Sequence, residues 1–205
     1  MKETITGSTV AGRYKVTGML RPGRMGDIYV ARRLEDDAKV AIKFLEPALF
    51  ENEEAIARFE RESKVAHAID HPCTIRVLEF GRSDHGPYLV MEFVEGELLS
   101  DVIEDKGALG PERAATITAR IARALQAAHE KGVVHRDLAP SNVVLGRQGE
   151  RTDLVKVSDF GLALLTHDDD EESTHLTAVG VRIGTPTYMA PEYIEEYELD
   201  QRADI

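Results

Sequence analysis

The chain has 205 residues, of which 42% are hydrophobic and 30% are charged. This composition is typical of a globular protein with one large core or two small lobes. The net charge of −12 argues against non-specific binding to nucleic acid, and a single cysteine, Cys73, excludes a disulfide framework and indicates a cytoplasmic setting. No apolar run reaches the ~18–20 residues of a membrane span, and the N-terminus has no signal-peptide pattern.

The first half of the chain is predicted to be rich in strands. Residues 1–13 are small and polar and predict a loose lead-in. Beyond them, segments rich in β-branched and aromatic residues are separated by turn residues, as in an antiparallel sheet. The expected strands cover residues 14–20, 27–31, 39–45, 74–81 and 88–94.

Lys43 lies within one of these apolar strands, so its charge must be paired or reach a ligand. The pattern of residues 53–69 predicts a helix, and Glu62 falls on the apolar face of that helix. The apolar stripe consists of Ile56, Phe59, Ala66 and Ile69. Glu62 is therefore the expected partner of Lys43. The alternative is an ordinary buried salt bridge with no further role.

Two more helices are expected at residues 98–106 and 111–131, the second with a proline in its first turn and a glycine just beyond its end. Residues 135–142, His-Arg-Asp-Leu-Ala-Pro-Ser-Asn, follow as a polar loop between apolar residues. A loop held at both ends in this way forms a rigid polar site. A short alternating strand then leads into residues 159–161, Asp-Phe-Gly.

These motifs together resemble those of eukaryotic-like protein kinases. Residues 135–142 resemble the catalytic loop, and residues 159–161 resemble the metal-binding Asp-Phe-Gly. Residues 20–28 resemble the glycine-rich loop, and they precede a Val-Ala-Ile-Lys sequence that ends at Lys43. Residues 184–192, Gly-Thr-Pro-Thr-Tyr-Met-Ala-Pro-Glu, resemble the end of an activation segment in the form typical of bacterial serine/threonine kinases.

The resemblance runs from about residue 14 to the end of the chain, and it implies an α+β fold with two lobes. The N-lobe, residues 14–94, would contain a five-stranded antiparallel sheet and one helix. A hinge at residues 92–96 would lead to a mainly helical and incomplete C-lobe, residues 97–205.

The implied activity is the Mg²⁺-dependent transfer of the γ-phosphate of ATP to Ser/Thr hydroxyls of protein substrates. Asp137 would be the catalytic base, Lys43 and Glu62 would position the phosphates, and Asn142 and Asp159 would bind Mg²⁺. The residues implied to contact the nucleotide are Leu20, Gly23, Gly26, Ile28, Ala41, Lys43, Met91, Glu92, Val94 and Val144. Thr174 and Thr177, which follow an acidic run, are the expected autophosphorylation sites.

Two positions depart from the family pattern. Arg21 stands where the first glycine of the loop is expected, and Ala139 stands where Ser/Thr kinases have a lysine. The chain also ends at Ile205, at the first turn of a long helix in the family. Two alternatives therefore stay open: a nucleotide-binding pseudokinase that acts as a scaffold, or an inactive fragment of a longer kinase. We expect little activity from these 205 residues alone.

Overall fold

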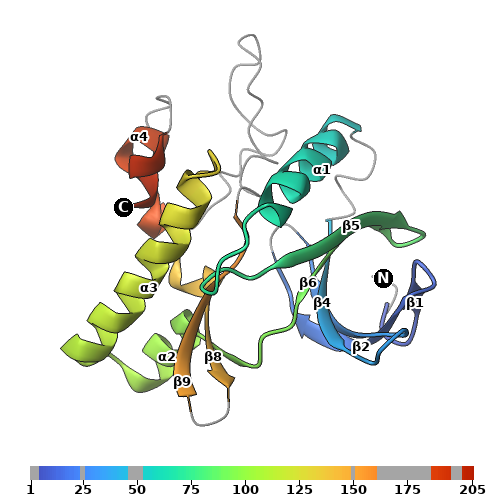
Figure 1. Cartoon of the computed structure of the whole chain (residues 1–205), viewed down its shortest axis with the longest axis horizontal. Coiled ribbons are helices and arrows are strands. Elements are labelled where there is room, and N and C mark those ends of the chain that lie inside the picture. The colour runs from blue at the N-terminus through green and yellow to red at the C-terminus, as the bar shows by residue number, and fades with distance from the viewer. Residues whose placement is uncertain (1–4, 24–25, 46–52, 149–150, 161–185, 195–199) are drawn as a thin grey trace. The chain divides into compact units, whose positions relative to one another are not determined.

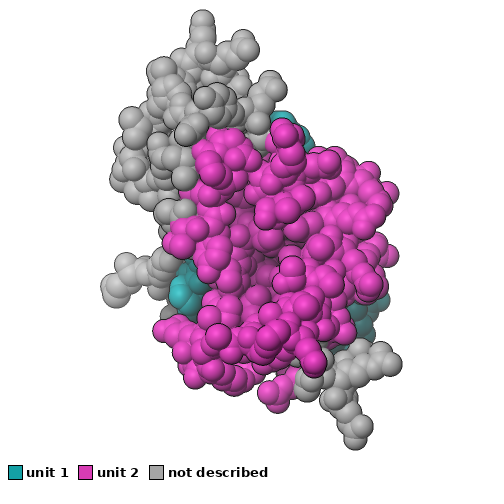
Figure 2. All heavy atoms as spheres, turned by 90° about the vertical axis from the view of Figure 1, so that its left-hand side faces the viewer, with its two compact units in different colours: residues 1–67, 76–93 teal, residues 68–75, 94–205 magenta. Residues whose placement is uncertain are grey.

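The structure is a computed structural model that describes residues 5–23, 26–45, 53–148, 151–160, 186–194 and 200–205. The chain forms two compact units (Figure 2). Unit 1 contains residues 1–67 and 76–93, and unit 2 contains residues 68–75 and 94–205. Within the described ranges, no helix is both long and apolar enough to cross a membrane.

Unit 1 is built on a six-stranded antiparallel sheet, which curls as it runs from β1 to β5 (Figure 1). The order of the strands across the sheet is β1-β2-β3-β4-β6-β5. The strands are β1 (Thr9–Val10), β2 (Tyr14–Arg21), β3 (Ile28–Arg33), β4 (Lys39–Phe44), β5 (Val77–Ser83) and β6 (Gly86–Glu92). The helix α1 (Glu53–His67) lies beside β5.

Alternating polarity explains the way in which the sheet buries its side chains. In the first half of β2, Tyr14 and Val16 are buried while Lys15 and Thr17 are exposed, as the period of a strand requires. Strand β4 lies between two neighbours and is buried along almost its whole length, so it reads as a continuous apolar run. The core of this sheet consists of Val10, Tyr14, Val16, Tyr29, Ala31, Val40, Ile42, Phe44, Tyr88 and Val90.

The structure differs from the sequence-based expectation at three places in this region. The segment expected to be a loose lead-in contributes the strand β1, because Val10 is fully buried in the core, so the sheet has six strands instead of five. The helix ends at His67 instead of residue 69, and Ile69 packs into the core of unit 2. Strand β5 begins at Val77, because Thr74 pairs with Val157 in unit 2.

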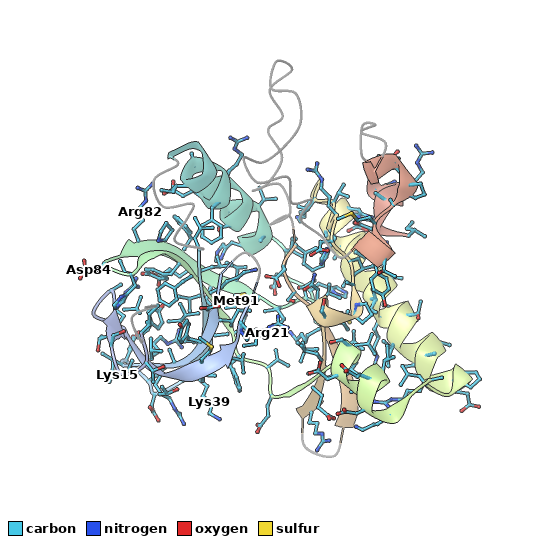
Figure 3. The ribbon with its side chains drawn as sticks, turned by 180° about the vertical axis from the view of Figure 1, so that it is seen from behind. Lys15, Arg21, Lys39, Arg82, Asp84 and Met91 are labelled. Carbon is cyan, nitrogen blue, oxygen red and sulfur yellow. The ribbon has the colours of Figure 1, made fainter. Side chains whose placement is uncertain are left out.

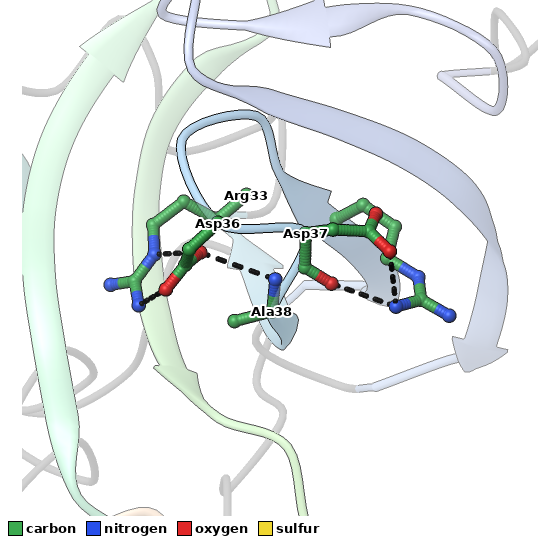
Figure 4. A network of polar contacts seen from close by, with 5 residues as sticks. Arg33, Asp36, Asp37 and Ala38 are labelled. Atoms are coloured by element: carbon green, nitrogen blue, oxygen red, sulfur yellow. Dashed lines mark hydrogen bonds and ion pairs between the residues drawn. The ribbon is translucent and has the colours of Figure 1, made fainter.

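Two ion pairs hold the turn between β3 and β4 (Figure 4). Arg33 donates to both carboxylate oxygens of Asp36, at 2.8 and 2.6 Å, and the amide of Ala38 donates to the same carboxylate at 3.2 Å. These hydrogen bonds lower the pKa of Asp36 to about 2, with the Arg33 side chain as the largest cause. Asp37 has a positive φ of 58°, and its side chain and carbonyl oxygen accept from Arg32.

Unit 2 combines two helices with a three-stranded antiparallel sheet. The helices are α2 (Leu99–Lys106) and α3 (Pro111–His129), and the strands are β7 (Gly96–Leu98), β8 (Val143–Gln148) and β9 (Arg151–Val157). Short helices η2 (Pro140–Asn142), η4 (Pro186–Tyr188), α4 (Pro191–Ile194) and η5 (Gln201–Asp204) complete the described part of this unit. Helix α3 packs along β9 (Figure 1).

The predicted start of α3 is confirmed, with Pro111 in its first turn. Gly132 follows the helix with φ of 73°, a conformation that favours glycine. The side chains of Ile117, Leu125 and Ala128 are buried, and their helical spacing places them on one face of α3. This face belongs to the core on which the loop at residues 135–142 is built.

Candidate functional site

Lys43 lies in the middle of the unit 1 sheet and is only 5% exposed. It is opposite Ile28 of β3 on one side and Leu89 of β6 on the other. The residues opposite Lys43 on both neighbouring strands are apolar, so the stem of its side chain starts among apolar neighbours.

The proposed partner of Lys43, Glu62, belongs to α1. The buried side chains of Ile56, Phe59 and Ala66 confirm the apolar stripe that the helical period predicted. The side chain of Glu62 lies outside the described part of the structure. The pairing of Glu62 with Lys43 therefore stays a prediction.

The two glycines of the loop between β2 and β3 are required by close backbone contacts. The amide of Gly26 donates to the carbonyl oxygen of Gly23 at 3.2 Å, which closes a tight turn. Gly26 has φ of 132°, and a Cβ atom there would lie 1.6 Å from the carbonyl oxygen of Phe44. A side chain on Gly26 would push the loop away from the end of β4, whereas a Cβ on Gly23 would lie 2.4 Å from the carbonyl oxygen of Gly26 and would open the tight turn.

Four of the residues implied to contact a nucleotide lie close together on neighbouring strands of unit 1. Ala41 pairs directly with Met91, which Figure 3 labels, and Ile28 pairs with Lys43 on the next strand. Residues directly opposite in an antiparallel pair share a face of the sheet. Glu92 is held at the end of β6 by Arg76, because each amide donates to an oxygen of the other residue at 2.9 Å.

Leu20 is exposed near the end of β2, beside Arg21 (Figure 3). The two remaining residues of this set, Val94 and Val144, belong to unit 2. Val144 is opposite Leu98 in the three-stranded sheet, and the Val94 side chain lies against Gly146. Of the residues predicted to contact a nucleotide, the structure thus brings Ile28, Ala41, Lys43 and Met91 together on neighbouring strands.

In unit 2 the loop at residues 135–142 brings Asp137 and Asn142 into contact. The Nδ2 atom of Asn142 donates to the carbonyl oxygen of Asp137 at 2.8 Å and to its Oδ2 atom at 3.3 Å. The Oδ1 atom of Asn142 is consequently turned away from Asp137. A proline-initiated turn, η2, places Asn142 for this contact.

Asp159 is connected to the same loop through Ser158. The amide of Ser158 donates to the carbonyl oxygen of Asn142 at 2.9 Å, and its carbonyl oxygen accepts from Nε2 of His135 at 2.8 Å. Asp159 itself has φ of 63°, and the next residue, Phe160, is buried in the core beside the His135 ring. His135 is fully buried, so it is a packed core histidine that supports the loop.

Sequence reasoning did not identify Asp204, which anchors the loop. Its side chain is fully buried and accepts hydrogen bonds from the amides of His135 and Arg136, both at 2.8 Å. His129 donates to the same carboxylate at 2.7 Å. Arg136 has a positive φ of 66°, a conformation that non-glycine residues adopt only when their surroundings hold them in it. No local pattern indicated Asp204, because its partners are about 70 residues away in the sequence.

The donor set of this loop fits Mg²⁺ chemically. The Asp159 carboxylate and the Asn142 Oδ1 atom are hard oxygen ligands, and Mg²⁺ is usually held by one or two protein oxygens together with phosphate oxygens and water. Both residues are connected through Ser158, so the protein can hold them in a constant relation. Thr174 and Thr177 lie outside the described residues.

The comparisons with known proteins identify the family of the chain. The family model for the protein kinase domain matches residues 14–205. The chain therefore belongs to the protein kinase family, and its relatives are serine/threonine kinases.

Among these relatives, serine/threonine-protein kinase pkn3 of Myxococcus xanthus is 38% identical over 200 residues, which are 97% of this chain and 36% of pkn3. Serine/threonine-protein kinase PknB of Mycobacterium tuberculosis is 34% identical over 204 residues, which are 98% of this chain and 32% of PknB. The chain thus spans about a third of the length of these two curated relatives.

The crystal structure of the PknI kinase domain from M. tuberculosis matches this structure with a TM-score of 0.74 and 30% sequence identity. The match covers 97% of this chain and 70% of that domain. This likeness confirms the predicted α+β kinase fold.

Proposed function

We propose that the chain is the catalytic part of a Ser/Thr protein kinase, which transfers the γ-phosphate of ATP to hydroxyl groups of protein substrates. The observation that carries this proposal is the hydrogen-bonded connection of Asp137, Asn142 and Asp159 within one unit. A base, an amide oxygen and a second carboxylate in a fixed relation are what phosphoryl transfer needs from a protein.

In the proposed reaction, the Asp137 carboxylate accepts a hydrogen bond from the substrate hydroxyl and receives its proton as the hydroxyl oxygen attacks the γ-phosphorus. The bond between the γ-phosphorus and the bridging oxygen breaks, and ADP leaves. The hydrogen bond from Asn142 to Asp137 holds the carboxylate in one orientation for this step.

Lys43 and Glu62 have a positioning role in this proposal. The ammonium group of Lys43, paired with Glu62, would bind the α- and β-phosphates from its fixed place on β4. The backbone amides near Gly23 and Gly26 would approach the phosphates closely, since no side chain of either residue stands between.

The base of the nucleotide would lie against the apolar group formed by Ile28, Ala41 and Met91, with Leu20 and Val144 completing its surroundings. The backbone of Glu92 and Val94 would read the polar edge of the base. Asn142 and Asp159 would hold Mg²⁺, which neutralises the charge that develops on the phosphates. Thr174 and Thr177 are proposed as sites of autophosphorylation.

One observation favours a second candidate, a nucleotide-binding pseudokinase. Ala139 occupies the place of the lysine that neutralises the transferring phosphoryl group in the resembling kinases, and it is 3% exposed, with its side chain packed in the fold. Losing one well-placed cation typically lowers the rate of such a reaction on the order of a hundredfold. A protein with this substitution can retain nucleotide binding while its catalysis is weak.

Transfer of radiolabelled phosphate from ATP to a Ser/Thr peptide library tests the proposal. The Asp137→Asn variant should lower the rate at least about a hundredfold, because it removes the base. The matched control is Asp105→Asn on the exposed surface of α2, which should leave the rate unchanged. A wild-type chain that binds Mg²⁺-nucleotide without any transfer would instead support the pseudokinase or the inactive fragment of a longer kinase.

A further inference from the structure

Ser158 has no role in the function proposed above, yet its side chain contacts both residues proposed to bind metal. It is 3% exposed, and its Oγ atom lies 3.2 Å from the carbonyl oxygen of Asn142 and 3.3 Å from Oδ2 of Asp159. Both neighbours are acceptors. A serine hydroxyl has one proton to donate, so it is shared between Asn142 and Asp159 or alternates between them.

The backbone of Ser158 is fixed independently of this hydroxyl. Its amide donates to the Asn142 carbonyl oxygen at 2.9 Å, and its carbonyl oxygen accepts from His135 at 2.8 Å. Removing the hydroxyl therefore leaves the connection between β9 and the loop in place. What changes is the contact with the Asp159 carboxylate.

Asp159 has a particular need for such a contact. Its φ of 63° lies in the left-handed region, which is unfavourable for a residue with a Cβ atom. A residue keeps such a backbone conformation only when its surroundings hold it there. Asp159 is held from both sides along the chain. The hydroxyl of Ser158 contacts its carboxylate, and the next residue, Phe160, is buried in the core.

We propose that Ser158 is a positioning residue of the metal site. Its hydroxyl orients the Asp159 carboxylate relative to Asn142, so that the two oxygen ligands are presented together. This inference rests on the proposed function, because it assumes that Asn142 and Asp159 bind Mg²⁺. Partners that orient metal ligands in this way typically change metal affinity 10- to 100-fold when they are removed.

The test compares wild type with Ser158→Ala and Ser158→Thr in the 205-residue chain. Mg²⁺ is titrated at a fixed concentration of a non-hydrolysable ATP analogue, and binding is followed by calorimetry. The same analogue is titrated without metal, and thermal unfolding is recorded without ligand. Ser158→Ala should raise the apparent dissociation constant for Mg²⁺ roughly 10-fold and leave metal-free nucleotide binding unchanged. Ser158→Thr keeps the hydroxyl and should restore Mg²⁺ binding to near the wild-type value.

Ser63→Ala is the matched control. Ser63 is a buried serine of α1 in unit 1, and its hydroxyl donates to the carbonyl oxygen of Phe59 at 2.6 Å. Its loss removes one buried hydroxyl, as in Ser158→Ala, but touches neither Asn142 nor Asp159. Mg²⁺ affinity should be the same as in wild type.

Three results would overturn the inference. The first is a Ser158→Ala variant whose dissociation constant for Mg²⁺ stays within twofold of wild type, with Mg²⁺-nucleotide binding otherwise normal; the proposed function would then stand. The second is equal weakening of nucleotide binding with and without metal, which indicates a merely structural role. The third is a wild-type chain with no Mg²⁺-dependent binding at all, which would refute the proposed metal site and this inference with it.

Discussion

In the described part of each unit, a carboxylate collects hydrogen bonds from distant parts of the chain, but the two sets of donors differ in kind. In unit 1, Glu79 of β5 accepts from the hydroxyls of Tyr14 at 2.8 Å and Tyr88 at 3.0 Å, and it pairs with Arg13. In unit 2, Asp204 accepts from two backbone amides and a histidine.

The difference shows what each carboxylate does. Glu79 joins side chains of β2 to β5 and β6, and β2 and β5 are not neighbours in the sheet, so the contact holds the curled sheet closed. Asp204 holds the main chain of His135 and Arg136, directly beside Asp137. A change at Glu79 should therefore affect the stability of unit 1. A change at Asp204 should affect both stability and the shape of the loop.

The largest effect is expected for Asp204→Ala. The variant leaves two buried amides and His129 without their acceptor, so the free energy of unfolding should fall by ~3–5 kcal/mol. Urea unfolding measures this loss, and hydrogen exchange should speed up at the amides of His135 and Arg136. The control is Asp105→Ala, an exposed acid on α2, for which a change below about 0.5 kcal/mol is expected. Slow exchange at both amides in Asp204→Ala would show that the loop does not depend on this anchor.

The next largest effect is a loss of stability at alkaline pH. Burial, and then hydrogen bonding to Glu79, raise the pKa of Tyr14 from 10.0 to about 12. Between pH 10 and 12 the Tyr14 hydroxyl therefore stays protonated in the folded chain, whereas it ionises in the unfolded chain. The contribution of Tyr14 to the free energy of unfolding is therefore fully present below pH 10. It is lost as the pH rises to about 12, and the total loss is up to ~2–3 kcal/mol.

Unfolding in urea at a series of alkaline pH values tests this dependence. The Tyr14→Phe variant cannot ionise at this position, so its free energy of unfolding should decline less between pH 10 and 12 than that of wild type. If the free energy of unfolding declined equally with pH in wild type and Tyr14→Phe, ionisation of Tyr14 would not be the cause of the alkaline loss.

A smaller effect is expected for Glu79→Gln. The amide oxygen still accepts one hydrogen bond, but the charge is lost and the NH₂ group faces a hydroxyl, so about 1–2 kcal/mol of stability should disappear. Glu60→Gln is the control, since Glu60 forms an exposed pair with Arg82 at 3.4 Å. Phosphate transfer should be nearly unaffected by Glu79→Gln. A loss of transfer as large as that in Asp137→Asn would mean that Glu79 also shapes the catalytic residues.

The smallest effect is expected for Asp36→Asn in the turn between β3 and β4. The pair with Arg33 is exposed, so the melting temperature at neutral pH should change by less than about 2 °C. Because the pKa of Asp36 is lowered from 3.8 to about 2, any stabilisation is present above pH 3.8 and is lost as the pH falls to about 2. Thermal melts over this acidic range measure it, with Glu35→Gln as the control. A loss of stability larger than that of Asp204→Ala would contradict the expectation that this exposed ion pair contributes least.

Most of the elements were predictable because their signals are local. The alternation in β2 and the helical spacing in α3 each depend on residues within one element, and the structure has both near the expected positions. The errors arose where burial depended on distant residues. Thr9 and Val10 are β-branched but form too short a run to predict a strand, and they become β1 because the edge of β2 is there to pair with them.

The sequence by itself determined the kinase family, the buried Lys43 and the loop that contains Asp137 and Asn142, since each is a short motif whose residues are close in the chain. Only the tertiary structure decided that Asp204 anchors this loop and that Glu79 closes the sheet. The hydrogen bond from Tyr14 to Glu79 and the three to Asp204 span 65 to 75 residues, and such a bond forms only when two distant folded segments meet. Neither periodicity nor a local motif predicts these hydrogen bonds, because the partners do not alter the sequence pattern of the segments in which they lie.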